Sequence, residues 1–230
     1  MSSIAIITAR GGSKRIPKKN IKYFCGKPII AYSIEAALSS EIFDKVMVST
    51  DDKEIAEIAI KYGAEVPFFR SAETSDDYAT TYDVINEVLL EYKNAGNEFD
   101  YACCIYPTAP FVTGEMLNKA FEIITEHNFS TVLPIVKFSY PPQRAFIIRE
   151  NSVQYQYPEN ISKRSQDLEA IYHDCGQFYF INVRDFNLEK KLIMNNCHGI
   201  VMSETEVQDI DSISDWELAE VKYKLMNNNK

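Results

Sequence analysis

The stretch Ile4–Asn20, IAIITARGGSKRIPKKN, joins a short apolar run to a loop of glycine and cationic residues. Ile4–Ile7 is continuous and mostly β-branched, which is typical of a strand buried on both faces of a parallel sheet. In the loop Arg10–Asn20, paired glycines let a phosphate approach the backbone, while amides and cationic side chains neutralise its charge. We therefore predict a phosphate-binding loop at the carboxyl end of the first strand, where open parallel sheets bind their ligands.

Two common phosphate-binding patterns do not fit this loop. The Rossmann pattern GxGxxG requires a residue between its first two glycines, whereas Gly11 and Gly12 are adjacent. The P-loop pattern ends in Gly-Lys-Ser or Gly-Lys-Thr, whereas Ser13 here precedes Lys14. A solvated basic loop remains an alternative on charge alone, because runs of charge usually face water. The position of the loop directly after a buried strand favours the phosphate site.

The charge distribution of the chain favours a small anionic ligand. The 230-residue chain has a formal net charge of −9, yet six of its 24 Lys and Arg residues lie between Arg10 and Lys22. Nonspecific binding of nucleic acid needs an extended basic surface, so we expect no nucleic-acid partner. An acidic protein that concentrates its positive charge in one segment is expected to bind a small polyanion there.

The N-terminus and the cysteines indicate a cytoplasmic protein. The first residues lack the basic n-region of a signal peptide, and Arg10 follows the apolar run too soon for a secretory segment. No apolar run reaches the length needed to cross a bilayer, so we expect no membrane association. The five cysteines show no CxxC pair and fit structural thiols in a reducing compartment better than disulfides or a zinc site.

Apolar strands alternate with amphipathic helices along most of the chain. Repeated βα units of this length indicate an α/β fold over residues 1–230, with a mostly parallel sheet, helices on both faces and right-handed crossovers. We predict helices at Pro28–Leu38, Ile55–Tyr62, Thr81–Ala95 and Gly114–Glu126. We predict core strands at Ile4–Ile7, Lys45–Ser49, Glu65–Phe69, Tyr101–Ile105, Thr131–Val136, Phe178–Asn182 and Gly199–Met202.

Two segments have acidic and hydroxyl residues at the spacing of helix starts. Asp51 with Glu54 is interpreted as the start of the helix ending near Tyr62, and Ser214 with Glu217 as a capping box opening the last helix. The last helix is expected to bury Trp216, Leu218 and Val221.

Residues 137–175 interrupt the alternation of helices and strands. Ala145–Ile148 and Val153–Tyr157 have the composition of short strands joined by a turn at Glu150-Asn151. We therefore predict a small β-rich arm outside the α/β core.

Asp209 and Asp211 form the second informative pattern. Two carboxylates at i and i+2 of an extended segment point the same way and can share a hard cation. Aspartates before a helix are also common as caps and turn formers, and the pattern alone leaves both interpretations open.

Several motifs in order resemble one known family. RGGSKRIPKKNIK (10–22), GKPIIAYSIEAA (26–37), VSTDD (48–52) and YGAEVPFFR (62–70) are similar to the sugar-acid cytidylyltransferases, which include the CMP-sialic acid synthetases or acylneuraminate cytidylyltransferases. The resemblance covers nearly the whole chain and implies a Rossmann-like nucleotidyltransferase fold whose arm packs across a homodimer. YPTAPF (106–111), SYPPQRA (139–145), RSQDL (164–168) and YHDCGQFY (172–179) are most similar to members that act on pseudaminic acid.

The resemblance implies transfer of CMP from CTP to a nine-carbon α-keto sugar acid, pseudaminic acid, with Mg²⁺ as cofactor and release of pyrophosphate. It places the activity in the biosynthesis of sialic acid-like sugars, with flagellin glycosylation as the associated process. Legionaminic and N-acetylneuraminic acid remain alternative acceptors. An alternative of another class is a catalytically silent protein that binds a nucleotide sugar.

The resemblance also implies roles for individual residues. Arg10, Lys19 and Asp211 are the expected catalytic residues, and Asp209 with Asp211 the expected metal ligands. The expected nucleotide-binding residues are Ala9, Arg10, Gly11, Gly12, Ser13, Lys19, Asn20, Arg70, Asp77 and Thr80.

The acceptor site is expected to combine arginines, amides and aromatic rings, because an arginine binds a sugar carboxylate well. Many sialic acid synthetases have QPTSP and a following arginine where this chain has YPTAPF, so contacts made through that glutamine and arginine are in question. Strand packing is an alternative for the two adjacent aromatic residues, since alternation puts one on each face. His173 beside Asp174 is interpreted as structural. The expected sugar-binding residues are Tyr106, Arg144, Arg164, Gln166, Gln177, Phe178 and Tyr179.

Overall fold

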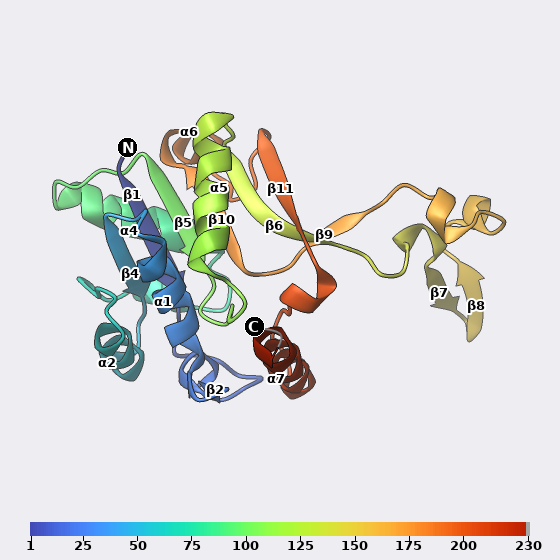
Figure 1. The fold of residues 1–230 in the computed structure, drawn as a ribbon, viewed down its shortest axis with the longest axis horizontal. Helices are drawn as coiled ribbons and strands as arrows, with labels where there is room; N and C mark the ends of the chain where they lie inside the picture. Colours follow the sequence, from blue (N-terminus) through green and yellow to red (C-terminus); the bar gives the residue numbers. More distant parts are fainter. Residues whose placement is uncertain (229–230) are drawn as a thin grey trace.

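The computed structural model describes residues 1–228 as a seven-stranded sheet covered by helices, with an arm extending from one side (Figure 1). The main strand order is β11-β6-β10-β5-β1-β4, and β9 pairs with β6. Neighbours β4, β1 and β5 are parallel, as are β6 and β11, whereas β10 and β9 run antiparallel to their partners. The predicted α/β fold with a mostly parallel sheet is confirmed. The strands are β1 (Ser3–Thr8), β4 (Lys45–Ser49), β5 (Tyr101–Ile105), β6 (Thr131–Lys137), β9 (Tyr172–Asp174), β10 (Phe178–Asn182) and β11 (Cys197–Met202).

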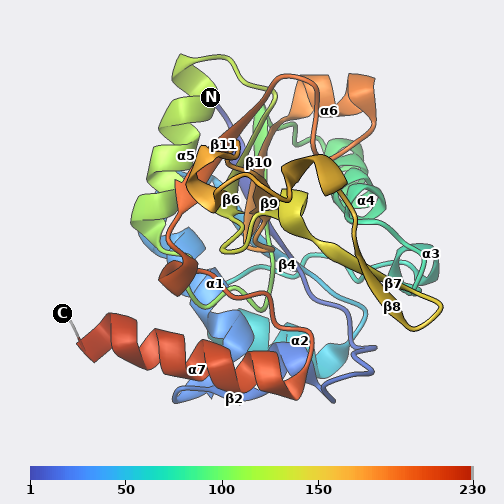
Figure 2. The same ribbon diagram turned by 90° about the vertical axis from the view of Figure 1, so that its right-hand side faces the viewer.

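The helices cover both faces of the sheet, because every central strand is apolar on both sides. On one face α1 (Ile29–Ser40), α2 (Lys53–Lys61) and α5 (Gly114–Glu126) bury apolar residues against the odd-numbered side chains of β1. On the other face α4 (Thr81–Asn94) and α6 (Val183–Glu189) pack against the even-numbered ones. Figure 2 shows α1 and α5 on one side of the sheet and α4 and α6 on the other.

A third apolar cluster joins the two ends of the chain. The short strands β2 (Tyr23–Phe24) and β3 (Lys27–Pro28) follow the basic loop, and α7 (Ile213–Asn228) packs against them. The rings of Phe24 and Trp216 meet edge to face with centroids 5.5 Å apart, an arrangement that aromatic pairs favour. This cluster fixes the segment before α7 beside the basic loop.

The expected strand at Glu65–Phe69 is wrong. Only Glu65 pairs with the sheet, through hydrogen bonds to Val46 and Val48 of β4. Pro67 lacks the N–H that would continue such a ladder.

Both expected helix starts are shifted. Asp52, rather than Asp51, caps α2, since its carboxylate accepts hydrogen bonds from the amides of Glu54 and Ile55. The last helix begins with a reciprocal pair between Ser212 and Asp215 rather than between Ser214 and Glu217.

The buried face of α7 also differs from the prediction. Trp216 and Ala219 are buried, whereas Leu218 and Val221 are 47% and 54% exposed. The cluster around Phe24 lies on the Trp216 side of the helix, and its position selects the face that is buried.

The arm contains the predicted hairpin. β7 (Phe146–Arg149) and β8 (Ser152–Tyr155) pair antiparallel, and Glu150 and Asn151 between them have positive φ values of 50° and 63°. Two central residues with positive φ are characteristic of a tight two-residue hairpin turn.

Candidate nucleotide and acceptor site

A cavity of about 630 Å³ lies at the carboxyl ends of β1 and β5, where the predicted phosphate loop meets the chain before α7. Its size is in the range of small-molecule sites. The predicted residues that line it are Arg10, Ser13, Lys19, Asn20, Arg70, Asp77, Thr80, Tyr106, Asp209 and Asp211. The structure thus brings together residues that are up to 201 positions apart in the sequence, from Arg10 to Asp211.

Contacts beneath the loop determine its shape. Ala9 is fully buried and its amide donates to the Ser49 carbonyl at 2.9 Å. Asn20 is buried, and its side-chain amide donates to the Arg10 carbonyl at 2.9 Å, which closes the loop on itself. Ile16 is 1% exposed and anchors the middle of the loop in the cluster around Phe24.

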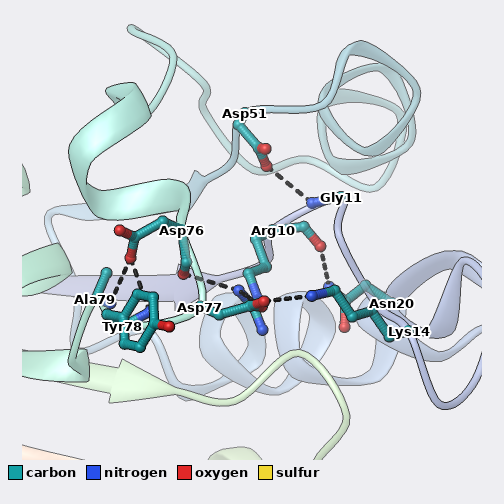
Figure 3. A network of polar contacts seen from close by, with 9 residues as sticks. All are labelled: Arg10, Gly11, Lys14, Asn20, Asp51, Asp76, Asp77, Tyr78 and Ala79. Atoms are coloured by element: carbon teal, nitrogen blue, oxygen red, sulfur yellow. Dashed lines mark hydrogen bonds and ion pairs between the residues drawn. The ribbon is translucent and has the colours of Figure 1, made fainter.

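The two loop glycines have different surroundings. The Gly11 amide donates to Asp51 at 2.8 Å (Figure 3), and a Cβ at Gly11 would lie 2.8 Å from a carboxylate oxygen of Asp52. A Cβ at Gly12 would meet nothing within 4 Å. Neither glycine is among the residues that line the cavity, and the Gly11 amide is already engaged by Asp51, so a contact with a phosphate would use the backbone of Gly12.

Asp77 pairs with two cations of the loop. Arg10 Nη1 lies 2.9 Å from Asp77 Oδ1, and Lys14 Nζ forms an ion pair with the other oxygen. Arg10 Nη1 also donates to the Asp76 carbonyl at 2.8 Å, and Figure 3 shows these groups converging on one side of the loop. Hydrogen bonds from Lys14 and Arg10 lower the pKa of Asp77 below its usual value. Asp77 is therefore an ionised counter-ion for cations that are expected to bind phosphate.

The carboxylate pair Asp209 and Asp211 lies against the part of the loop that carries Arg15 and Lys19. Asp211 Oδ1 lies 2.8 Å from Arg15 and 3.6 Å from Lys19, and Lys19 Nζ donates to the Ile210 carbonyl at 2.7 Å. Burial, and then the charge of Asp211, raise the pKa of Asp209. Two carboxylates beside cations that are expected to bind phosphate form a donor set that fits Mg²⁺, which is commonly bound by one or two carboxylates together with substrate phosphates.

Arg70 and Thr80 belong to the other wall of the cavity. Arg70 is 8% exposed, and its guanidinium donates to the Ser49 hydroxyl at 3.0 Å and to the Ser49 carbonyl at 2.7 Å. Burial lowers the pKa of Arg70, but an arginine side chain stays protonated in proteins. Thr80 opens α4 in a reciprocal capping pair with Asp83, so its position is fixed by the helix start.

The predicted acceptor residues divide into four in the α/β core and three in the arm. Of those in the core, one lines the cavity. Tyr106 lines the cavity directly after β5. Phe178 and Tyr179 pack in opposite faces of the sheet, which confirms the expected alternation, and neither lines the cavity. Gln177 is 1% exposed and donates to the Glu206 carbonyl at 2.9 Å.

The arm residues lie away from the cavity within the described part of the chain. Arg164 forms a two-pronged hydrogen bond with Asp167 at 2.8 and 3.0 Å, and Arg144 donates to the Ser165 hydroxyl at 3.3 Å. Gln166 lines a separate cavity of about 250 Å³ at the base of the arm. Figure 1 shows the hairpin of the arm well separated from β1 and β5, at whose carboxyl ends the cavity lies. A single chain therefore does not bring these three side chains to the nucleotide site.

The cavity also has lining residues that were not predicted from the sequence. Arg15 is distinguished in the sequence only as part of the basic segment, whereas Thr81, Pro107 and Thr108 have no signal of their own beyond adjacency to predicted residues. In residues 1–228, no helix combines the length and apolar character needed to cross a membrane.

Comparison with known proteins agrees with this geometry. The profile of the cytidylyltransferase family matches residues 4–214. A pseudaminic acid cytidylyltransferase from Campylobacter jejuni is 43% identical over 226 residues, covering 98% of this chain and 97% of the relative. A CMP-N,N'-diacetyllegionaminic acid synthase from Legionella pneumophila is 34% identical, and the match covers 100% of this chain and 98% of the relative.

The fold has a counterpart among solved structures. A CMP:2-keto-3-deoxy-manno-octonic acid synthetase complexed with CTP superimposes with a TM-score of 0.70 at 16% identity, and the match covers 100% of both chains. That likeness supports the Rossmann-like α/β architecture expected from the sequence. With the family profile spanning most of its length and a close relative along nearly all of it, the chain belongs to the cytidylyltransferase family.

Proposed function

We propose that the chain transfers the CMP group of CTP to a hydroxyl of a nine-carbon α-keto sugar acid, pseudaminic acid, and releases pyrophosphate. The observation that carries this proposal is that the basic loop and the Asp209–Asp211 pair line one cavity. The similarity to the Campylobacter jejuni relative supports pseudaminic acid as the acceptor.

In this reaction the acceptor hydroxyl attacks the α-phosphorus in line, a new P–O bond forms, and the bond to pyrophosphate breaks. The hydroxyl proton leaves to solvent. The protein contributes mainly by positioning the reactants and by stabilising the spread negative charge. We assign Arg10, Lys19 and Ser13 to the phosphates that leave, since all three line the cavity on the loop side.

Backbone groups and the opposite wall complete the nucleotide site. The backbone at Gly12 is open to the phosphates, whereas Ala9 and Gly11 shape the loop through their hydrogen bonds to Ser49 and Asp51, and Asn20 holds the loop closed. Arg70 and Thr80 are assigned to the nucleotide side of the cavity. Asp77 is assigned to the same side of the cavity, where it is the counter-ion of Arg10.

We propose that Asp209 and Asp211 hold Mg²⁺. A bound Mg²⁺ would supply positive charge that neutralises the phosphates and acidifies a coordinated hydroxyl. Arg15 and Lys19 lie beside Asp211, so positive charge from the loop reaches this carboxylate.

We further propose a cytoplasmic homodimer. The arm carries exposed apolar side chains, including Phe146, Ile148 and Val153 at 58%, 75% and 63% exposure. A second copy is the proposed partner of this surface, and Arg144, Arg164 and Gln166 are proposed to contribute to sugar binding in that assembly. Sedimentation should give a dimer, and a monomer at micromolar concentration would contradict this part of the proposal. Flagellin glycosylation as the destination of the product stays a prediction.

Pyrophosphate release measured with CTP, Mg²⁺ and one sugar acid at a time tests the function. Pseudaminic acid should give the highest kcat/KM, and legionaminic or N-acetylneuraminic acid would be the acceptor if either exceeds it. CTP binding in calorimetry without pyrophosphate release from any acceptor would favour the silent binding protein instead.

The variant Asp211→Asn tests the carboxylate pair. It should abolish turnover while circular dichroism stays unchanged, because the amide keeps the shape of the side chain but loses its charge. Glu217→Gln, an exposed carboxylate on α7 outside the cavity, is the matched control and should keep wild-type turnover. Wild-type activity in Asp211→Asn would remove this residue from the mechanism.

A further inference from the structure

Asp174 lies at the end of β9, and both of its carboxylate oxygens are used. One accepts the amide of Gly176 at 2.8 Å, and the other accepts the hydroxyl of Tyr179. Tyr179 is 4% exposed, and burial raises the pKa of its hydroxyl, so the phenol stays protonated and remains a donor. A buried phenol with a charged acceptor on a fixed turn has little freedom to move.

The ring of Tyr179 in turn supports Tyr106. The two ring centroids are 5.6 Å apart, and Tyr106 lines the cavity whereas Tyr179 lies behind it. The Tyr106 hydroxyl lies 3.3 Å from the Thr81 hydroxyl, which also faces the cavity. The backbone of Tyr106 is held separately, because its amide donates to the Gln177 carbonyl at 2.8 Å. The backbone contact therefore fixes where the residue sits, and Tyr179 fixes where its ring points.

The same turn reaches the carboxylate pair. Gly176 has φ +62°, and a Cβ there would lie 3.3 Å from the carboxyl carbon of Asp209. Asp174 does not itself line the cavity. It is connected to the cavity through the rings of Tyr179 and Tyr106, and its turn at Gly176 packs against Asp209.

We infer that Asp174 is a positioning residue for acceptor specificity: through Tyr179 it holds the Tyr106 ring and hydroxyl in place on the acceptor side of the cavity. The inference rests on the proposed function. Aromatic rings pack against acyl and methyl groups, and the paired hydroxyls of Tyr106 and Thr81 provide a polar contact for a sugar hydroxyl. The phosphate loop is held by other contacts, so loss of Asp174 should affect the sugar and spare CTP.

The test is steady-state kinetics of Asp174→Asn, Tyr179→Phe and the double variant, with CTP and pseudaminic acid varied separately. Tyr179→Phe should raise the KM for the sugar acid about tenfold, as expected for loss of one hydrogen bond to a charged group, and leave the KM for CTP within about twofold. Asp174→Asn should raise the sugar KM by a smaller factor, because its amide oxygen still accepts the Tyr179 hydroxyl but without the charge. The double variant should be no worse than Tyr179→Phe alone, because both changes act on the same contact. Tyr179→Phe keeps the ring volume and so serves as the variant that is expected to fold.

Asp100→Asn is the matched control. Asp100 likewise accepts a backbone amide, that of Ser2 at 2.8 Å, but at the opposite end of β5, so both KM values should stay at the wild-type level. An unchanged sugar KM in Tyr179→Phe, an equal rise in both KM values, or additive effects in the double variant would overturn the inference. If the wild type itself releases no pyrophosphate with any sugar acid, the proposed function fails first and the inference fails with it.

Discussion

A methyl group added at Gly11 should damage the phosphate loop, whereas the same group at Gly12 should not. The Cβ of Gly11→Ala would lie 2.8 Å from a carboxylate oxygen of Asp52 and 2.9 Å from its Cβ. Contacts this short force either the loop or Asp52 to move. Asp52 is the N-cap of α2, and Gly11 donates to the neighbouring Asp51, so each way of relieving the clash breaks a hydrogen bond.

The size of the effect follows from the contacts that are lost. Loss of the cap or loss of the Gly11 hydrogen bond costs about 1 kcal/mol by either route. Alanine restricts the unfolded chain more than glycine does, which offsets about 0.5 kcal/mol. The net loss of about 0.5 kcal/mol corresponds to a decrease in Tm of about 1–2 °C for a protein of this length.

Thermal unfolding followed by circular dichroism, without nucleotide, measures the difference. Gly12→Ala should unfold within about 1 °C of the wild type or slightly above it, because its Cβ enters open space at an ordinary φ. Gly11→Ala should also raise the KM for CTP about tenfold, because a displaced loop no longer matches the phosphates. Equal melting temperatures for the two variants, or a larger loss at Gly12, would refute the reasoning.

Three further changes test the charges and caps of the structure. Asp77→Asn should lower the KM for CTP about two- to fivefold, because phosphate no longer competes with a carboxylate for Arg10; a higher KM would mean that Asp77 contacts the nucleotide productively. Hydrogen bonds from Thr80 lower the pKa of Asp83, so the stability that this carboxylate provides is present at neutral pH and lost as the pH falls through that lowered pKa. Asp83→Asn should therefore reduce Tm at pH 7 and match the wild type well below pH ~3.9, and a difference that persists in acid would contradict this account. Ser212→Ala should lower the free energy of unfolding in urea by about 1 kcal/mol, and Glu217→Ala should lower it by less than about 0.5 kcal/mol. A larger loss in Glu217→Ala would favour the helix start expected from the sequence.

Local patterns were sufficient for most of the elements. The predicted helix Gly114–Glu126 and the strand Phe178–Asn182 have the bounds that the structure shows, because apolar periodicity and flanking polar residues are properties of the segment itself. The hairpin turn at Glu150-Asn151 was likewise predictable, since Asn151 is a residue that tolerates positive φ and it lies between two short apolar runs.

The predictions were wrong where contacts with another segment of the chain determine the local structure. Glu65–Phe69 has the composition of a strand, but only one residue finds a partner on β4. Trp216, Leu218 and Val221 are all apolar, and the cluster around Phe24 determines that only Trp216 is buried among them. Competing caps one or two residues apart cannot be ranked by spacing, because the choice depends on where the chain enters the helix.

The sequence by itself determined that a strand is followed by a glycine-containing cationic loop, and that two carboxylates precede the last helix. Both are local facts of composition and spacing. Only the tertiary structure decided that they meet: Lys19 donates to the carbonyl of Ile210 at 2.7 Å across a separation of 191 residues. The strand order of the sheet and the packing of α7 on β2 produce this contact, since spacing along a chain carries no information about which distant segments pair.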